Sequence, residues 1–132
     1  MHRIEIASSL SNITEVESLI DKVCDDLGLN EDYYGNILIA VTEAVNNAII
    51  HGNKNEESKQ VVVEVDHEGT NLTFNVIDNG DGFDFENLPD PTAPENLEKP
   101  DGRGIFLMKN LSDDVNFDLN GSKVSITFAV NA

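Results

Sequence analysis

The chain has few basic residues: its 132 residues include 8 Lys and Arg against 25 Asp and Glu, a formal net charge of −17. Such an acidic surface repels phosphate backbones and anionic lipid headgroups, which argues against nucleic-acid binding and against binding to a membrane surface. A basic protein partner, or a cation carried with a ligand, suits this charge. With only one cysteine, Cys24, no disulfide can form within the chain, which fits a reducing compartment.

Long apolar runs are also missing. No run approaches the ~20 residues of a membrane span, and the N-terminal residues lack the apolar stretch of a signal peptide. We therefore expect a cytoplasmic protein. The length and the 39% hydrophobic content suffice for a real core, so residues 1–132 are interpreted as one domain. Cys24 recurs with apolar neighbours at helical spacing and is expected to be a small core or boundary residue.

Alternation and helical periodicity predict five strands and three helices. The strands are expected at residues 3–7, 61–66, 72–77, 115–119 and 124–130. The helices are expected at about 12–27, 30–52 and 105–111, with Ser11 or Asn12 capping the first, Gly28 ending it and Asn30 capping the second. Strands joined by tight hairpins are antiparallel. The predicted fold class is α+β: a two-layer sandwich of a mixed, mainly antiparallel sheet with helices on one face.

The second predicted helix carries a polar stripe. Glu43, Asn47 and His51 follow one another at intervals of four, so their side chains leave from one face. Burying polar groups without partners is costly, so a polar ligand is expected to dock there. An asparagine oxygen suits Mg²⁺, which commonly shares its shell with substrate phosphates. A carboxylate one turn earlier could accept a proton from a water or a hydroxyl. The alternative is a helix with a solvated polar face.

A second segment, Asp78-Asn79-Gly80-Asp81-Gly82, follows a predicted strand. Asp78 at the strand end could accept a hydrogen bond from an exocyclic amine such as that of adenine. Gly80 and Gly82 allow positive φ and a close approach of a ligand to the backbone. The alternative is an ordinary turn, because Asn-Gly and Asp-Gly are common turn dipeptides. A calcium loop fails, since Gly80 stands where an EF-hand needs Asp or Asn.

A third segment, Gly102-Arg103-Gly104, opens the last predicted helix, where free backbone N–H groups can face an anion. The alternative is a plain junction between a loop and a helix. Residues 89–101 just before it have no periodicity and several prolines, and they could act as a lid over a site.

In this order the three segments resemble the boxes of the GHKL, or Bergerat-fold, ATPases, also called histidine-kinase-like ATPases. Glu43-x-x-x-Asn47 resembles the N box, Asp78-x-Gly80-x-Gly82 the G1 box and Gly102-x-Gly104 the G2 box, with residues 89–101 as the ATP lid. The closer resemblance is to the stand-alone anti-sigma factor serine kinases of bacteria (RsbW type). It is carried by residues 43–51, 102–108 and 111–115.

The resemblance implies a role for each matching residue. Asn47 would coordinate Mg²⁺, Asp78 would bind the adenine amine of ATP, and Glu43 would be the general base for a serine hydroxyl. The nucleotide pocket would be shaped by four glycines: Gly80, Gly82, Gly102 and Gly104. His51 would line the site or serve packing. Lys99 and Arg103 are both available as the basic residue that the family places near the γ-phosphate.

The function implied is that of an ATP-binding serine/threonine-protein kinase. Its substrate would be an anti-anti-sigma regulator of STAS type, and sequestration of a sigma factor would be a second role. The alternative is a non-catalytic, ATP-dependent binding module. Because family members are often dimers, a homodimer stays open. Histidine kinases share the fold, but their N box usually has asparagine where this chain has Glu43, and only His2 is available upstream as a phosphoacceptor.

Overall fold

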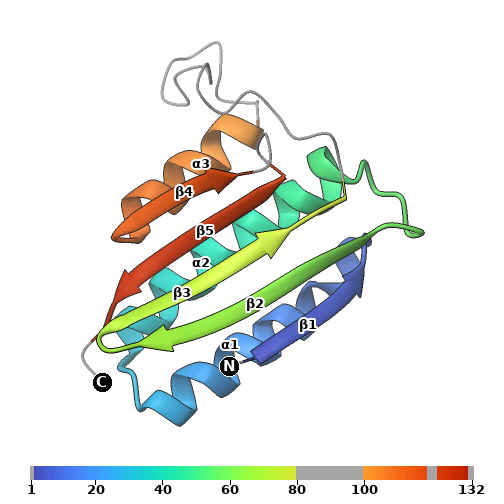
Figure 1. The fold of residues 1–132 in the computed structure, drawn as a ribbon. Coiled ribbons are helices and arrows are strands. Elements are labelled where there is room, and N and C mark those ends of the chain that lie inside the picture. Colours follow the sequence, from blue (N-terminus) through green and yellow to red (C-terminus); the bar gives the residue numbers. More distant parts are fainter. Residues whose placement is uncertain (1, 80–99, 119–121, 131–132) are drawn as a thin grey trace.

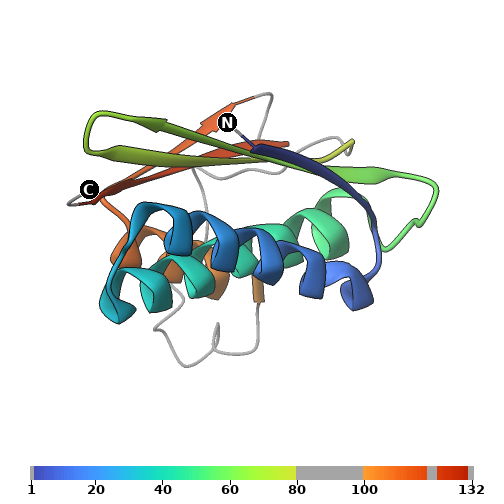
Figure 2. The same ribbon diagram turned by 90° about the horizontal axis from the view of Figure 1, so that it is seen from below.

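The computed structural model describes residues 2–79, 100–118 and 122–130. Helices cover one face of a five-stranded sheet, which gives two layers (Figures 1 and 2). The strands are β1 (His2–Ala7), β2 (Gln60–Glu68), β3 (Asn71–Ile77), β4 (Asp114–Asp118) and β5 (Lys123–Ala129). The helices are α1 (Ile13–Leu27), α2 (Glu31–Asn47) and α3 (Pro100–Leu111), with a 3₁₀ turn at Leu10–Asn12 and a π-helical turn, η2, at Ala48–Gly52.

The sheet has the strand order β1-β2-β3-β5-β4. The predicted α+β two-layer fold is confirmed, and each strand pairing that the structure describes is antiparallel rather than mixed. The chain leaves the sheet after β3, forms α3 and returns at the far edge as β4. It then places β5 between β4 and β3 (Figure 1). This step brings the start of β5 beside the end of β3, where Ile77 is paired with Lys123.

The core lies between the sheet and the helices and follows the alternation of the strands. Phe74 on the central strand is fully buried and meets Phe128 edge to face, with ring centroids 6.2 Å apart. From the helices, Ile20 and Val41 are also fully buried. Cys24 is buried as expected. Its burial, and to a smaller extent the negative charge of Asp21, raise the pKa of its thiol to about 11. Within the described ranges, no helix is long and apolar enough to cross a membrane.

Two of the predicted helix ends are confirmed. Gly28 ends α1 in the left-handed region, with φ of 64°. The Asn30 side chain accepts hydrogen bonds from the N–H groups of Asp32 and Tyr33 at 3.0 and 3.2 Å. Asn12 occupies the predicted N-cap position of α1, but its side chain makes no capping hydrogen bond. Asn12 has helical backbone angles at the start of α1, and its amide instead donates to the carbonyl of Ala7 at 3.0 Å, which fastens the helix to β1.

The second helix changes its geometry near its end. The α-helix stops at Asn47, and the predicted extension to Gly52 is a π-helical turn. The N–H of Asn53 donates across this turn to the carbonyl of Ala48 at 2.8 Å, five residues back. Such wide turns are often found at functional sites.

The third helix begins earlier than predicted. It starts at Pro100 rather than Ile105, so residues 102–104 lie inside its first turns rather than in front of it. Proline suits a first helical position because the N–H it lacks would have had no partner there. The N–H groups of a helix's first turn have no partner within it, so that of Gly102 can still face an anion. The predictions for Gly80, Gly82 and Lys99 lie outside the described residues, as do residues 89–99 of the predicted lid and the Arg103 side chain. The last two residues of the predicted lid, Pro100 and Asp101, belong to α3 instead.

Candidate functional site

A pocket that is partly open to solvent lies where the end of α2 and the π-helical turn meet α3, the end of β3 and the start of β5. Its lining is mostly apolar, with a few polar side chains among them, which is typical of small-molecule sites. The lining residues are Ala44, Asn47, Ala48, His51, Gly52, Val76, Asp78, Ile105, Met108, Phe117, Ser122 and Val124. The pocket therefore combines residues from the first two predicted site segments with the helix that the third one opens.

Asp78 is half-buried, directly after β3, and its backbone is anchored on both sides. Its own N–H donates to the carbonyl of Ser122 at 2.9 Å. The next N–H, that of Asn79, donates to the side-chain oxygen of Asn53 at 2.8 Å. These two bonds fix where the Asp78 carboxylate enters the pocket.

The Asp78 carboxylate lies against Gly52, the last residue of the π-helical turn. A Cβ added to Gly52 would overlap the carboxylate carbon and both of its oxygens. Only glycine leaves room for the carboxylate in this position. Sequence reasoning treated Gly52 as the end of a helix and missed this role, because a contact between a helix end and a strand end leaves no local signal.

Asn47 lines the pocket, and its Nδ2 is buried with no hydrogen-bond partner among the described residues. A buried donor without a partner costs about 1–3 kcal/mol, so a bound ligand would stabilise this arrangement. The described residues contain no cluster of three acidic, His or Cys side chains suited to a metal. Mg²⁺ does not need such a cluster, because one or two protein oxygens with substrate phosphates and waters hold it. A single asparagine therefore fits Mg²⁺ brought in with a nucleotide.

The polar stripe of α2 is only partly inside the pocket. His51 lies in the lining together with Asn47, whereas Glu43 is half-buried on the turn before Asn47 and outside the lining. Each step of four residues advances about 6 Å along a helix. The stripe therefore leads from His51, next to Gly52 in the chain, past Asn47 to Glu43, which does not line the pocket.

Several residues of the pocket were not predicted as site residues. Ala44 and Ala48 are both buried, yet they also line the pocket. Met108 and Phe117 join them from α3 and β4. Their apolar character gave no signal, because a residue that packs in a core and one that lines an apolar pocket look alike in sequence.

Comparison with known proteins decides the family. Residues 6–128 match the model of the histidine kinase-like ATPase domain. The chain belongs to this family. The predicted resemblance is thereby confirmed.

Curated relatives of this ATPase domain have two kinds of name. The chain is 31% identical over 130 residues to an anti-sigma F factor of Clostridium beijerinckii, covering 93% of this chain and 90% of the relative. It is 28% identical over 99 residues to the serine-protein kinase RsbW of Oceanobacillus iheyensis, covering 70% and 63%. It is 34% identical over 94 residues to the RsbW of Listeria innocua, covering 67% and 60%. The chain thus spans less than two thirds of the length of these two kinases.

Solved structures show the same fold. The RsbU and RsbW domains of Rv1364c from Mycobacterium tuberculosis match 98% of this chain and 31% of theirs, with a TM-score of 0.68 at 17% identity. The histidine kinase domain of a blue-light activated histidine kinase from Erythrobacter litoralis matches 95% of this chain and 62% of its own, with a TM-score of 0.56 at 17% identity.

Proposed function

We propose that the chain is an ATP- and Mg²⁺-dependent serine/threonine-protein kinase of anti-sigma factor type, acting in the cytoplasm. It transfers the γ-phosphate of ATP to a serine or threonine of a small anti-anti-sigma protein of STAS type. The names of the relatives, serine-protein kinase and anti-sigma F factor, support this proposal.

The observation that carries the proposal is the Asp78 carboxylate held over Gly52 at one end of an apolar pocket. A fixed carboxylate accepts hydrogen bonds from an amine, and the apolar walls suit the faces of a flat base. The adenine of ATP would therefore lie at this end. The phosphates would extend toward Asn47 and the first turn of α3, where free N–H groups and the helix dipole favour negative charge.

The direction of the polar stripe supports a catalytic role for Glu43. Beyond Asn47, Glu43 would accept the proton of the serine or threonine hydroxyl. The hydroxyl oxygen would attack the γ-phosphorus, and the bond between the γ-phosphorus and the oxygen that bridges it to the β-phosphate would break. When bound, Mg²⁺ supplies charge neutralisation on the phosphates. Asn47 would hold it through its side-chain oxygen, and either Lys99 or Arg103 would approach the γ-phosphate.

A second role is the sequestration of a partner without phosphotransfer. The net charge of −17 favours a partner with a basic surface, because opposite charges speed and orient encounter. One relative that covers 93% of this chain is named an anti-sigma F factor, and this name supports a sigma factor as the partner. The two roles are compatible in one protein.

Incubation with γ-labelled ATP, Mg²⁺ and STAS proteins encoded nearby tests the proposal. Label on a serine or threonine of one of them, lost on chelation of Mg²⁺, is the expected result. If ATP binds but no STAS protein is labelled, the chain is a binding module. If ATP does not bind, the assignment of the pocket is wrong.

A further inference from the structure

Asn53, the residue directly after the π-helical turn, is fully buried although its side chain is polar. Its Nδ2 donates to the hydroxyl of Ser8 at 2.7 Å and to the carbonyl of Gln60 at 3.0 Å. Its Oδ1 accepts the N–H of Asn79 at 2.8 Å. A buried amide with both its oxygen and its nitrogen paired is costly to disturb, because each partner left alone is a buried polar group.

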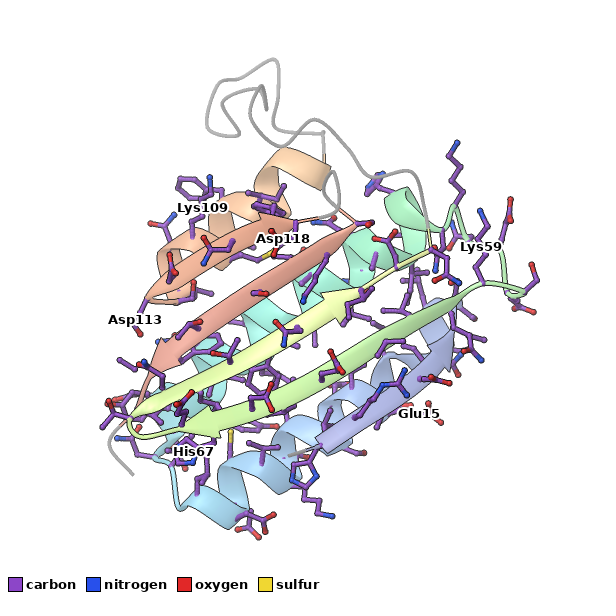
Figure 3. All side chains as sticks on the ribbon, viewed as in Figure 1. Glu15, Lys59, His67, Lys109, Asp113 and Asp118 are labelled. Carbon is purple, nitrogen blue, oxygen red and sulfur yellow. The ribbon has the colours of Figure 1, made fainter. Side chains whose placement is uncertain are left out.

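These bonds join three strand ends at one edge of the molecule. Ser8 follows β1 and donates to the carbonyl of Lys59 at 2.8 Å, just before Gln60 opens β2. Asn79 follows β3 by two residues. The three ends lie together in Figure 1, and Figure 3 labels Lys59 at this edge. Asn53 thus connects a fixed part of the sheet, at β1 and β2, with the segment that carries Asp78.

The connection matters because of where it attaches. Asp78 is held from the β5 side by Ser122 and from the α2 side, one residue later, by Asn53. The Asn53 bond ties the backbone that follows Asp78 to the helix end that supplies Gly52. Asn53 itself is absent from the lining of the pocket, so it would act on a ligand through lining residues next to its bonds, of which Asp78 is the one beside Asn79.

We propose that Asn53 is a positioning residue that sets the preference of the pocket for a 6-amino purine. By holding the N–H of Asn79, it keeps the Asp78 carboxylate over Gly52, where it can accept a hydrogen bond from the exocyclic amine. This inference rests on the proposed function, since it assumes that the base of ATP lies at Asp78.

Inosine triphosphate tests it, because a carbonyl oxygen replaces the exocyclic amine of ATP. The full chain is titrated with Mg-ATP and with Mg-ITP, and the ratio of the two dissociation constants is compared among variants. Asn53→Ala is expected to lower the preference for ATP about tenfold or more, the effect of losing a hydrogen bond to a charged acceptor. Asn79→Pro should lower the preference for ATP by a similar factor, because proline has no N–H to donate to the side-chain oxygen of Asn53.

Ser8→Ala is the matched control. It removes a buried partner of the same amide and should lower stability in urea, but it leaves the bond to Asn79 in place, so the ratio should stay within about twofold of wild type. Asn79→Pro keeps the test valid if Asn53→Ala does not fold.

Two results overturn the inference: a wild-type ratio in Asn53→Ala or Asn79→Pro, or an equal loss of preference in Ser8→Ala. A wild-type chain that binds ATP no better than ITP overturns the adenine assignment itself. The failure of the proposed function is thereby distinguished from the failure of the inference.

Discussion

Replacing Gly52 by alanine is expected to weaken ATP binding strongly while the fold persists. The new methyl group would occupy space now taken by the Asp78 carboxylate, and both carboxylate oxygens would be overlapped. Because Ser122 and Asn53 hold the backbone around Asp78, the strain would fall on the carboxylate, which must swing away.

The magnitude follows from the bond that is lost. A hydrogen bond to a charged group contributes about 1.5–3 kcal/mol, which corresponds to roughly 10- to 150-fold in the dissociation constant. The backbone itself should tolerate the change, since Gly52 has no positive φ and alanine favours helical conformations by up to about 1 kcal/mol. The affinity should therefore fall without a matching loss of stability.

Titration with a fluorescent ATP analogue and urea unfolding measure the two effects separately. Gly35→Ala is the control, because a Cβ there meets nothing within 4 Å and the residue lies in α2, the helix that leads into the π-helical turn of Gly52. It should leave the affinity unchanged and stabilise the chain slightly. If Gly52→Ala binds ATP as tightly as wild type, the reasoning that places the base at Asp78 is refuted.

Four further substitutions or conditions give separate outcomes. Glu43→Ala should keep ATP binding while phosphotransfer to a STAS protein collapses by at least about 100-fold; loss of binding instead would give Glu43 a structural role. Asn47→Ala should weaken Mg-ATP binding, and an unchanged affinity by titration would contradict the metal assignment. The raised thiol pKa of Cys24, about 11, predicts that the folded chain is alkylated at pH 8 much more slowly than the chain unfolded in urea. Because the pKa of the folded state lies above that of the unfolded state, the stability that the neutral thiol contributes is lost as pH rises from about 8.5 toward 11. Phe74→Ala should lower the free energy of unfolding by about 3–5 kcal/mol, measured in urea, since it empties the centre of the core; a cost near zero would mean that the core collapses to fill the cavity.

Much of the fold could be predicted because its signals are local. Alternation in β2, β3 and β5 follows from the two faces of a strand, and the Asn30 cap follows from a side chain that reaches its own helix. The start of α3 was predicted too late because Pro100 was assigned to the preceding loop, although proline at a first helical position is as favourable as in a loop.

The candidate site divides in the same way. The spacing of Glu43, Asn47 and His51 on one helix, and Asp78 at a strand end, could be read from the sequence because polar residues there conflict with a simple core. Gly52 and Asn53 could not, since each acts through a partner more than 20 residues away in the chain. No local pattern distinguishes a glycine that ends a helix from one that makes room for a carboxylate.

Most helices and strands, the two-layer class and the available chemistry could be inferred from the sequence, because periodicity and residue type act over a few residues. The packing of the whole chain was needed to show that β5 lies between β3 and β4, that the second helix ends in a π-helical turn, and that Asp78 rests on Gly52 beside Asn53. These outcomes depend on which distant segments pack together, and that is settled by the burial of the whole core rather than by any one stretch of the chain.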